Sequence, residues 1–143
     1  MKNINLLLLI LTAFVLFGCE KNNQVTNSTP QGEGGKIHNV STIGQFESEV
    51  LESDKPVLVK FHAEWCGACK ILTPRINELS SEYEGRVKFV TVDVDSAAAL
   101  AKQYGIRSLP TVFIFNEGKE AGKIIGAGNL ASYREKLNSV IGK

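Results

Sequence analysis

From residue 37 onward, the chain alternates between short β-branched runs and longer stretches with helical periodicity. Runs rich in β-branched and aromatic residues are candidate strands: 56–62, 86–93, 111–115 and 120–125. Stretches with apolar residues at helical spacing are candidate helices: 42–53, 66–83, 96–104 and 129–141. Strand, helix, strand and helix, followed by a hairpin and a closing helix, predict an α/β domain. We expect a central mixed β-sheet flanked by helices on both faces.

The composition is that of an ordinary globular protein. The chain has 143 residues, with 16 Lys plus Arg against 15 Asp plus Glu, and 43% of its residues are hydrophobic. This balance argues against a disordered chain and against a polybasic nucleic-acid binder. The length suits one folded domain. We therefore expect a monomer with no nucleic-acid partner.

The first residues have the layout of an export signal. An apolar run over 6–17 follows Lys2. At about a dozen residues it is shorter than the roughly 18 needed to span a bilayer, and it matches the apolar region of a signal peptide. Residues 16–19 (Leu-Phe-Gly-Cys) resemble the lipobox of bacterial lipoproteins, in which cleavage occurs before a cysteine that becomes lipidated. The resemblance implies a lipoprotein-type signal peptide over 1–18 and a lipid anchor on Cys19.

The segment 19–36 is predicted to be a flexible tether from the lipidated Cys19. It is rich in Asn, Gln, Thr, Ser and Gly and has almost no large apolar side chain. Such a segment cannot bury enough surface to offset its ordering entropy. The folded domain is then expected over 37–143. The protein would be extracytoplasmic and lipid-anchored to a bacterial membrane, on its periplasmic or outer cell-surface side.

The motif that most directly indicates chemistry is the pair Cys66 and Cys69, at the start of a predicted helix. Residues three apart share a helix face, and their Cα separation of roughly 5 to 6 Å suits a disulfide that opens and closes. The helix N-terminus favours an anionic sulfur, which makes Cys66 the candidate nucleophile. Cys69, one turn deeper, is the candidate resolving thiol that attacks a mixed disulfide.

Two other interpretations of the cysteine pair stay open on spacing alone. Cys-x-x-Cys is also half of a zinc site, although the chain has no second pair and only His38 and His62 as other soft ligands in the domain. The pair could also be a purely structural disulfide. We expect no metal site, and no cofactor other than the redox-active Cys66–Cys69 disulfide.

With these motifs in this order, the domain resembles thioredoxin. Residues 63–70 (Ala-Glu-Trp-Cys-Gly-Ala-Cys-Lys) resemble the family's active-site segment, with Ala68 where thioredoxins usually have Pro. Residues 104–111 resemble the segment that bears the family's cis-proline, and Gly126 and Gly128 fall in its closing glycine region. The resemblance implies a thioredoxin fold over nearly the whole folded domain.

The resemblance also implies roles for the residues around the cysteines. Pro110 should be cis and face the pair, with the Leu109 backbone available to pair with a substrate peptide. Trp65 is expected to lie on the same substrate-binding surface, although a core aromatic is the alternative. Gly67 and Ala68, between the cysteines, would support the site.

Three positions depart from the family's proton relay. The buried acid that assists the deeper cysteine falls on Lys60, its usual lysine partner falls on Thr91, and the aromatic two positions after the acid falls on His62. A charged Lys60 near the sulfurs would stabilise thiolates and make the pair more oxidising. A neutral Lys60 could replace the acid as a base. In a third interpretation, Lys60 snorkels to the rim of the sheet.

The sequence therefore predicts an enzyme, a membrane-tethered extracytoplasmic thiol-disulfide oxidoreductase that reduces protein disulfides. Its partners would be protein thiol and disulfide substrates and a membrane electron donor, because cytosolic reductants do not cross the membrane. One alternative is a disulfide oxidase or isomerase with the same site. The other is a non-catalytic thioredoxin-fold binding module.

Overall fold

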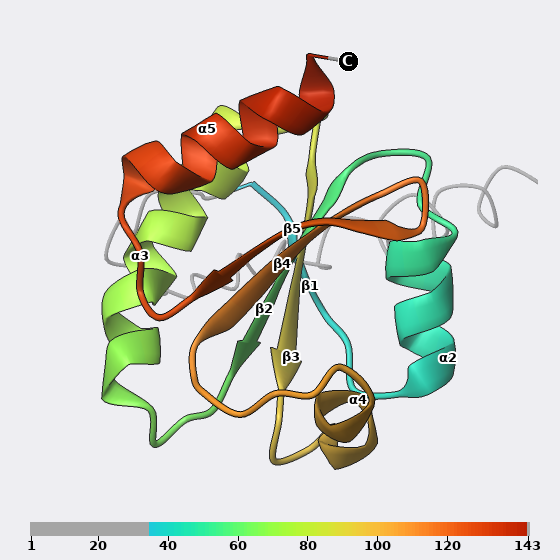
Figure 1. Ribbon diagram of the computed structural model, residues 1–143, viewed down its shortest axis with the longest axis vertical. Coiled ribbons are helices and arrows are strands. Elements are labelled where there is room, and N and C mark those ends of the chain that lie inside the picture. Colours follow the sequence, from blue (N-terminus) through green and yellow to red (C-terminus); the bar gives the residue numbers. More distant parts are fainter. Residues whose placement is uncertain (1–34, 143) are drawn as a thin grey trace, which may run out of the picture. The chain divides into compact units, whose positions relative to one another are not determined.

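The computed structural model describes residues 35–142, which form a five-stranded sheet with helices on both faces (Figure 1). The strands are β1 (Ile37–Asn39), β2 (Val57–His62), β3 (Lys88–Asp93), β4 (Thr111–Asn116) and β5 (Lys119–Ile125). The helices are α2 (Ile43–Phe46), the π-helical turn η1 (Glu47–Leu51), α3 (Gly67–Glu82), α4 (Ala98–Gln103) and α5 (Leu130–Ile141). The predicted signal peptide and Cys19 lie outside the described residues.

The strand order across the sheet is β1-β3-β2-β4-β5. Strands β1 and β2 run parallel to β3, whereas β4 is antiparallel to both β2 and β5. The predicted mixed sheet is therefore confirmed, and the predicted hairpin is β4–β5. Strand β1 is not evident from the sequence, because three residues are too few to show a period.

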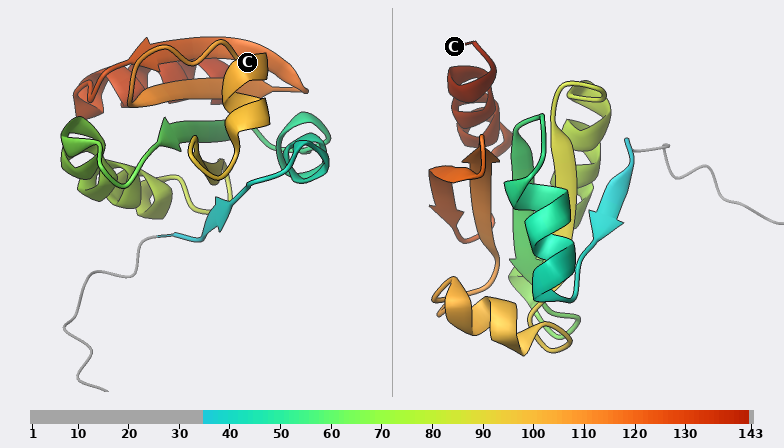
Figure 2. Two further views of the ribbon diagram at one scale, coloured as in Figure 1. Left: turned by 90° about the horizontal axis from the view of Figure 1, so that it is seen from below. Right: turned by 90° about the vertical axis from the view of Figure 1, so that its right-hand side faces the viewer.

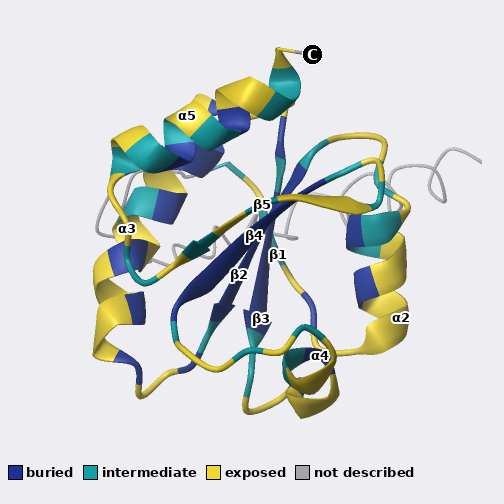
Figure 3. Ribbon diagram, viewed as in Figure 1, coloured by how far each residue is buried: buried dark blue, intermediate teal, exposed yellow. Residues whose placement is uncertain are grey.

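Side-chain alternation along the central strands divides the core into two layers. In β2, Val59 and Phe61 face one side of the sheet, and Leu58 faces the other. The core beneath α2, η1 and α4 includes Phe46, Val50, Leu100 and Phe113. The core beneath α3 and α5 includes Leu72, Ile76, Leu79, Tyr133 and Leu137. Figures 2 and 3 show these helices on opposite faces and the buried strands between them, so the prediction of helices on both faces is confirmed.

The helices in the described part of the chain are those of a compact α/β domain. None of them, within residues 35–142, has the length and apolar character needed to cross a membrane.

Candidate active site

Helix α3 begins at the cysteine pair. Cys66 is its N-cap residue and Cys69 lies in its first turn. The two sulfurs form a disulfide, with the Cα atoms 5.2 Å apart. The N–H of Cys69 donates a hydrogen bond of 3.1 Å to Sγ of Cys66, as backbone donors do to an N-cap side chain. In the reduced protein the same donor would favour a thiolate on Cys66.

A groove borders one of the two cysteines. It has a volume of about 720 Å³, and Cys66 lines it while Cys69 does not. Cys69 is 2% exposed and packs with Ala63 and Cys66 against Val94 and Leu109. A partner molecule in the groove would meet Cys66 first, which is the arrangement that the predicted roles of nucleophile and resolving thiol require.

Trp65 forms one wall of the groove. Its side chain is 71% exposed, so the interpretation of Trp65 as a core aromatic is wrong. The indole N–H donates a hydrogen bond to Oδ2 of Asp95, in the turn that follows β3. Asp95 is a residue that sequence reasoning missed, because no spacing rule links it to a tryptophan 30 positions earlier.

The loop before β4 also lines the groove. The Leu109–Pro110 peptide bond is cis, as the resemblance implied. The side chain of Leu109 packs against the cysteines and lines the groove. The Pro110 carbonyl accepts a hydrogen bond of 2.8 Å from the N–H of Gly126. Within residues 35–142 the main-chain N–H and C=O of Leu109 have no hydrogen-bond partner, which leaves them available to a peptide in the groove.

Lys60 lies beneath the first turns of α3. Strand alternation places its side chain on the α3 face, and it is only 4% exposed, so the interpretation that it snorkels to the rim is wrong. Its Nζ donates a hydrogen bond of 3.1 Å to Oγ1 of Thr73, which donates one of 2.9 Å to the Cys69 carbonyl. Burial lowers the pKa of Lys60 below its usual value, and the nearby Glu64 carboxylate opposes that shift. Thr73 could have been found from sequence, since it lies four residues after Cys69 on the same helix face.

His62 and Thr91 complete the surroundings of Lys60. Burial and, secondly, the positive charge of Lys60 lower the pKa of His62, while Asp93 and Glu64 act in the opposite direction. Thr91 pairs with Lys60 across β2 and β3, but its hydroxyl donates a hydrogen bond to Oδ1 of Asn39. Thr91 therefore belongs to the contact that holds β1 and does not bond to the lysine.

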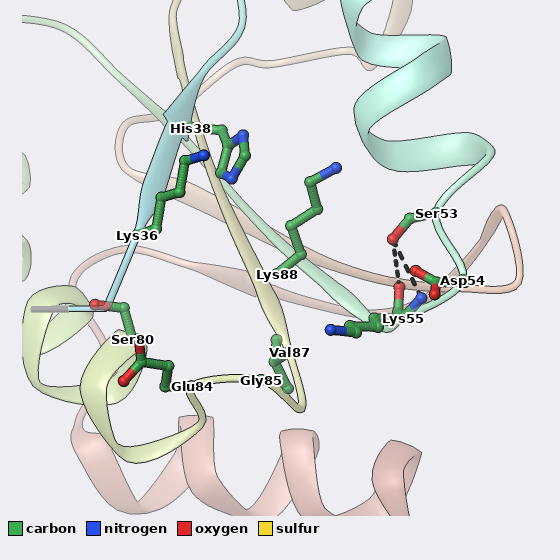
Figure 4. A pocket seen from close by; sticks show the side chains of 10 residues that line it. All are labelled: Lys36, His38, Ser53, Asp54, Lys55, Ser80, Glu84, Gly85, Val87 and Lys88. Carbon is green, nitrogen blue, oxygen red and sulfur yellow. Dashed lines mark hydrogen bonds between the residues drawn. The ribbon is translucent and has the colours of Figure 1, made fainter.

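A second hollow, of about 460 Å³, lies at the other end of the sheet (Figure 4). It is formed where β2 and β3 begin, whereas the cysteines follow the end of β2. Its charged or titratable lining residues are Lys36, His38, Asp54, Lys55, Glu84 and Lys88. Oε2 of Glu49 forms an ion pair with Lys88 and lies 3.2 Å from Nδ1 of His38. These contacts tie β1 to β3 and η1, and they bring no cysteine to the hollow.

A disulfide at the edge of an open groove can exchange with the thiols of another protein, and its reduced form can exchange with that protein's disulfides. This fold and site therefore define a protein-disulfide oxidoreductase. The chain belongs to the thioredoxin family, whose sequence profile, described as thioredoxin, matches residues 37–139. Members of this family use a redox-active disulfide and need no external cofactor.

Named relatives and solved structures agree with this assignment. The chain is 45% identical to the thioredoxin of Rickettsia felis over 100 residues, which cover 70% of this chain and 95% of that one. It is 46% identical to thioredoxin 1 of a Nostoc species over 86 residues, 60% of this chain and 80% of that one. The crystal structure of thioredoxin from Trypanosoma brucei brucei has a TM-score of 0.71 at 28% identity, covering 81% of this chain and 100% of that one. The Malassezia sympodialis thioredoxin structure has a TM-score of 0.69 at 27% identity, covering 81% and 99%.

Proposed function

We propose that this thioredoxin-family protein is a membrane-tethered reductase of protein disulfides that works outside the cytoplasm. The main support for this reaction is the Cys66–Cys69 disulfide at the start of α3. Cys66 lines the groove, and Cys69 does not. The family match begins at residue 37, directly after the predicted tether over 19–36, which supports the proposed division of the chain.

The reaction transfers two electrons to the substrate. The Cys66 thiolate attacks one sulfur of a substrate disulfide, and the other substrate sulfur leaves as a thiolate. Cys69 then attacks Sγ of Cys66, which breaks the mixed disulfide and releases the second substrate thiol. The protein is left with the closed Cys66–Cys69 disulfide. A membrane electron donor would have to reduce it for the next cycle.

The groove supplies the binding surface for the substrate chain. Trp65 and Leu109 line it, as do Gly67 and Ala68, which lie between the cysteines in sequence. The unpaired main chain of Leu109 before the cis Pro110 can form β-type hydrogen bonds with an extended peptide. Main-chain pairing carries little sequence preference, which suits an enzyme that acts on several proteins.

The place where the chain joins the domain is compatible with a tether. Ile37 pairs with Phe89 near the start of β3, at the end of the sheet away from the cysteines. Just before it, the N–H of Gly35 donates to Oγ of Ser81 on α3, and a Cβ on Gly35 would lie 2.1 Å from the Ser80 carbonyl oxygen. The described chain therefore enters the domain at the end of the sheet away from the cysteines.

Trapping experiments test the reductase. The protein should reduce insulin in the presence of dithiothreitol, and Cys66→Ser should abolish that activity. Cys69→Ser should accumulate mixed disulfides through Cys66, because the resolving thiol is gone. A wild-type protein that neither turns over insulin nor yields trapped partners would favour the binding-module alternative.

Fractionation tests the tether. The full chain expressed in a bacterium should incorporate labelled fatty acid and partition with membranes, and Cys19→Ser should remain soluble with unchanged insulin reduction. Membrane association that survives Cys19→Ser would contradict the lipid anchor while leaving the redox activity intact.

A disulfide oxidase or isomerase is the second candidate, and the buried Lys60 favours it. An ammonium or a hydrogen-bonded amine near the cysteines stabilises the reduced pair and raises its reduction potential. The redox state of the protein in growing cells separates the two functions: a reductase is held mainly as the dithiol and an oxidase mainly as the disulfide.

A further inference from the structure

The position of Lys60 is unusual for a lysine, because its side chain is almost completely buried. It is 4% exposed, and its neighbours across the sheet are Thr91 on one side and Val112 on the other. Within residues 35–142 no carboxylate forms an ion pair with it. A buried lysine without an ion-pair partner lowers stability in its charged form. The stability of the fold therefore does not explain a lysine at position 60, so its amine is a candidate for a function.

The contacts of Lys60 lead to the resolving cysteine. Its Nζ is bonded to the hydroxyl of Thr73, and that hydroxyl is bonded to the carbonyl of Cys69. Cys69 and Thr73 lie one helical turn apart on α3, with Cys69 buried and Thr73 exposed. One side-chain hydroxyl therefore links the amine to the turn that carries Cys69.

We propose that Lys60 takes up the proton that the Cys69 thiol must lose when it resolves a mixed disulfide. This inference rests on the proposed function and adds a proton acceptor to it. The neutral amine accepts the thiol proton and becomes an ammonium. The electron pair left on Cys69 forms the bond to Sγ of Cys66, and the bond between Cys66 and the substrate sulfur breaks, so that the substrate leaves as a thiolate. When a donor reduces the disulfide again, the ammonium returns the proton to Cys69.

The electrostatic surroundings allow both forms of the amine. Burial lowers the pKa of Lys60 and so favours the neutral amine, whereas the Glu64 carboxylate raises that pKa and favours the ammonium. The other charged or titratable groups near it are His62 on its own strand and Asp93 on β3, which act on each other as well. Thr91, Val112 and Thr73, from the neighbouring strands and α3, are uncharged. Lysine is suited to this role because its pKa responds strongly to burial.

Stopped-flow mixing of the reduced full-length protein with a symmetrical aromatic disulfide separates the two steps. The first coloured thiolate reports attack by Cys66, and the second reports resolution by Cys69. We expect Lys60→Met to slow the second release at neutral pH by on the order of 100-fold. The inflection in its pH profile should disappear, while the first release changes less than about twofold. Lys60→Gln replaces Lys60→Met in this comparison if the latter does not fold.

Lys60→Asp distinguishes proton uptake from simple charge stabilisation. A buried carboxylate can also accept a proton, so Lys60→Asp should resolve faster than Lys60→Met. If the lysine acted only through its positive charge, Lys60→Asp would be the slowest variant, and the inference would be overturned. The matched control is Lys119→Met, which removes an exposed lysine at the start of β5, outside the active-site segment, and should leave the second step unchanged.

The outcomes separate the two levels of the proposal. Equal second-step rates and pH profiles in the wild type and Lys60→Met would overturn the role of Lys60 and leave the reductase standing. A wild-type protein that releases no second thiolate would instead remove the proposed function itself.

Discussion

The indole N–H of Trp65 donates a hydrogen bond of 2.8 Å to Oδ2 of Asp95. The bond joins the segment after β2 to the turn after β3. It positions a tryptophan that is 71% exposed and has no core around it to hold it in place. One wall of the groove therefore depends on a single contact between two loops.

Replacing Asp95 should loosen Trp65 with little effect on folding. We expect Asp95→Ala to lower kcat/KM for protein disulfides about fivefold, the equivalent of a hydrogen bond of about 1 kcal/mol. The chain has one tryptophan, so a change in fluorescence emission reports on this indole alone. Asp54→Ala, at an exposed acid far from the cysteines, is the control. Unchanged emission and kinetics in Asp95→Ala would show that the bond does not position the indole.

The two glycines after β5 should differ in their tolerance of alanine. Gly126 and Gly128 both have positive φ, 86° and 53°. A Cβ on Gly126 meets nothing within 4 Å, whereas one on Gly128 would lie 2.9 Å from Cε2 of the buried Tyr133. Gly126→Ala should cost about 1–2 kcal/mol of unfolding free energy from backbone strain. Gly128→Ala should cost about 1–3 kcal/mol more from overpacking. Urea denaturation measures both, and equal losses would contradict the predicted contact with Tyr133.

The stability contributed by position 60 should depend on pH. Burial lowers the pKa of Lys60 in the folded state below the unfolded value of 10.5, so the unfolded chain binds the proton more tightly. Below the folded pKa of Lys60, its buried ammonium destabilises the folded protein. This destabilisation disappears as the pH rises from the folded pKa through 10.5, because the amine is then neutral in both states. Lys60→Met should therefore gain about 1–3 kcal/mol at pH 7 and clearly less at pH 10.5. Paired urea titrations at the two pH values test this, and a gain that does not shrink at high pH would refute it.

The pKa of His62 should depend on the charges of Lys60 and Asp93. Burial and the Lys60 ammonium lower its pKa below 6.5, and Asp93 raises it. In NMR titrations, Lys60→Met should raise the pKa of His62 and Asp93→Asn should lower it further. Because the unfolded chain binds this proton more tightly, the protein should lose stability as the pH falls from about 6.5 through the folded pKa. Shifts of the same sign in both variants would contradict this arrangement of charges.

The reduction potential should lie above that of ordinary thioredoxin. In the reduced protein, a proton shared between Cys69 and Lys60 stabilises the dithiol form, and the disulfide form gains no equivalent contact. Lys60→Met should lower the potential, and Ala68→Pro, which restores the residue usual in the family, should lower it as well. Equilibration with a glutathione buffer measures all three proteins. A wild-type value at or below about −270 mV would refute the prediction.

Local patterns predicted most of the elements and the position of the redox pair. Thr42 and Gln45 have capping-box spacing, and in the structure the Thr42 side chain accepts from the N–H of Gln45 while the Gln45 side chain accepts from that of Thr42. The Cα atoms of Cys66 and Cys69 lie 5.2 Å apart, a separation that follows once a helix begins at Cys66. Both interactions lie within one turn of the chain, so they form wherever that turn is helical.

Contacts across the sheet were not predictable in this way. The position of Lys60 within a β-branched run indicated a strand, and three environments for its side chain remained open. Its burial follows from the register of β2 between β3 and β4 and from the packing of α3 over that face. The partners Thr73 and Asp95 depend on the same packing, because each is brought to its site by an element that pairs or packs far from its own sequence neighbours.

The sequence by itself therefore determined the order of strands and helices, the capping of the helices and the pairing of Cys66 with Cys69. Short-range sterics and the period of apolar residues act along the chain, and neither depends on the final packing. Only the tertiary structure decided that Lys60 is buried and bonded to Thr73, that Trp65 is bonded to Asp95, and that residues 37–39 form an edge strand. These contacts join residues distant in the chain, and they exist only once burial of both sheet faces has selected one strand order and one register.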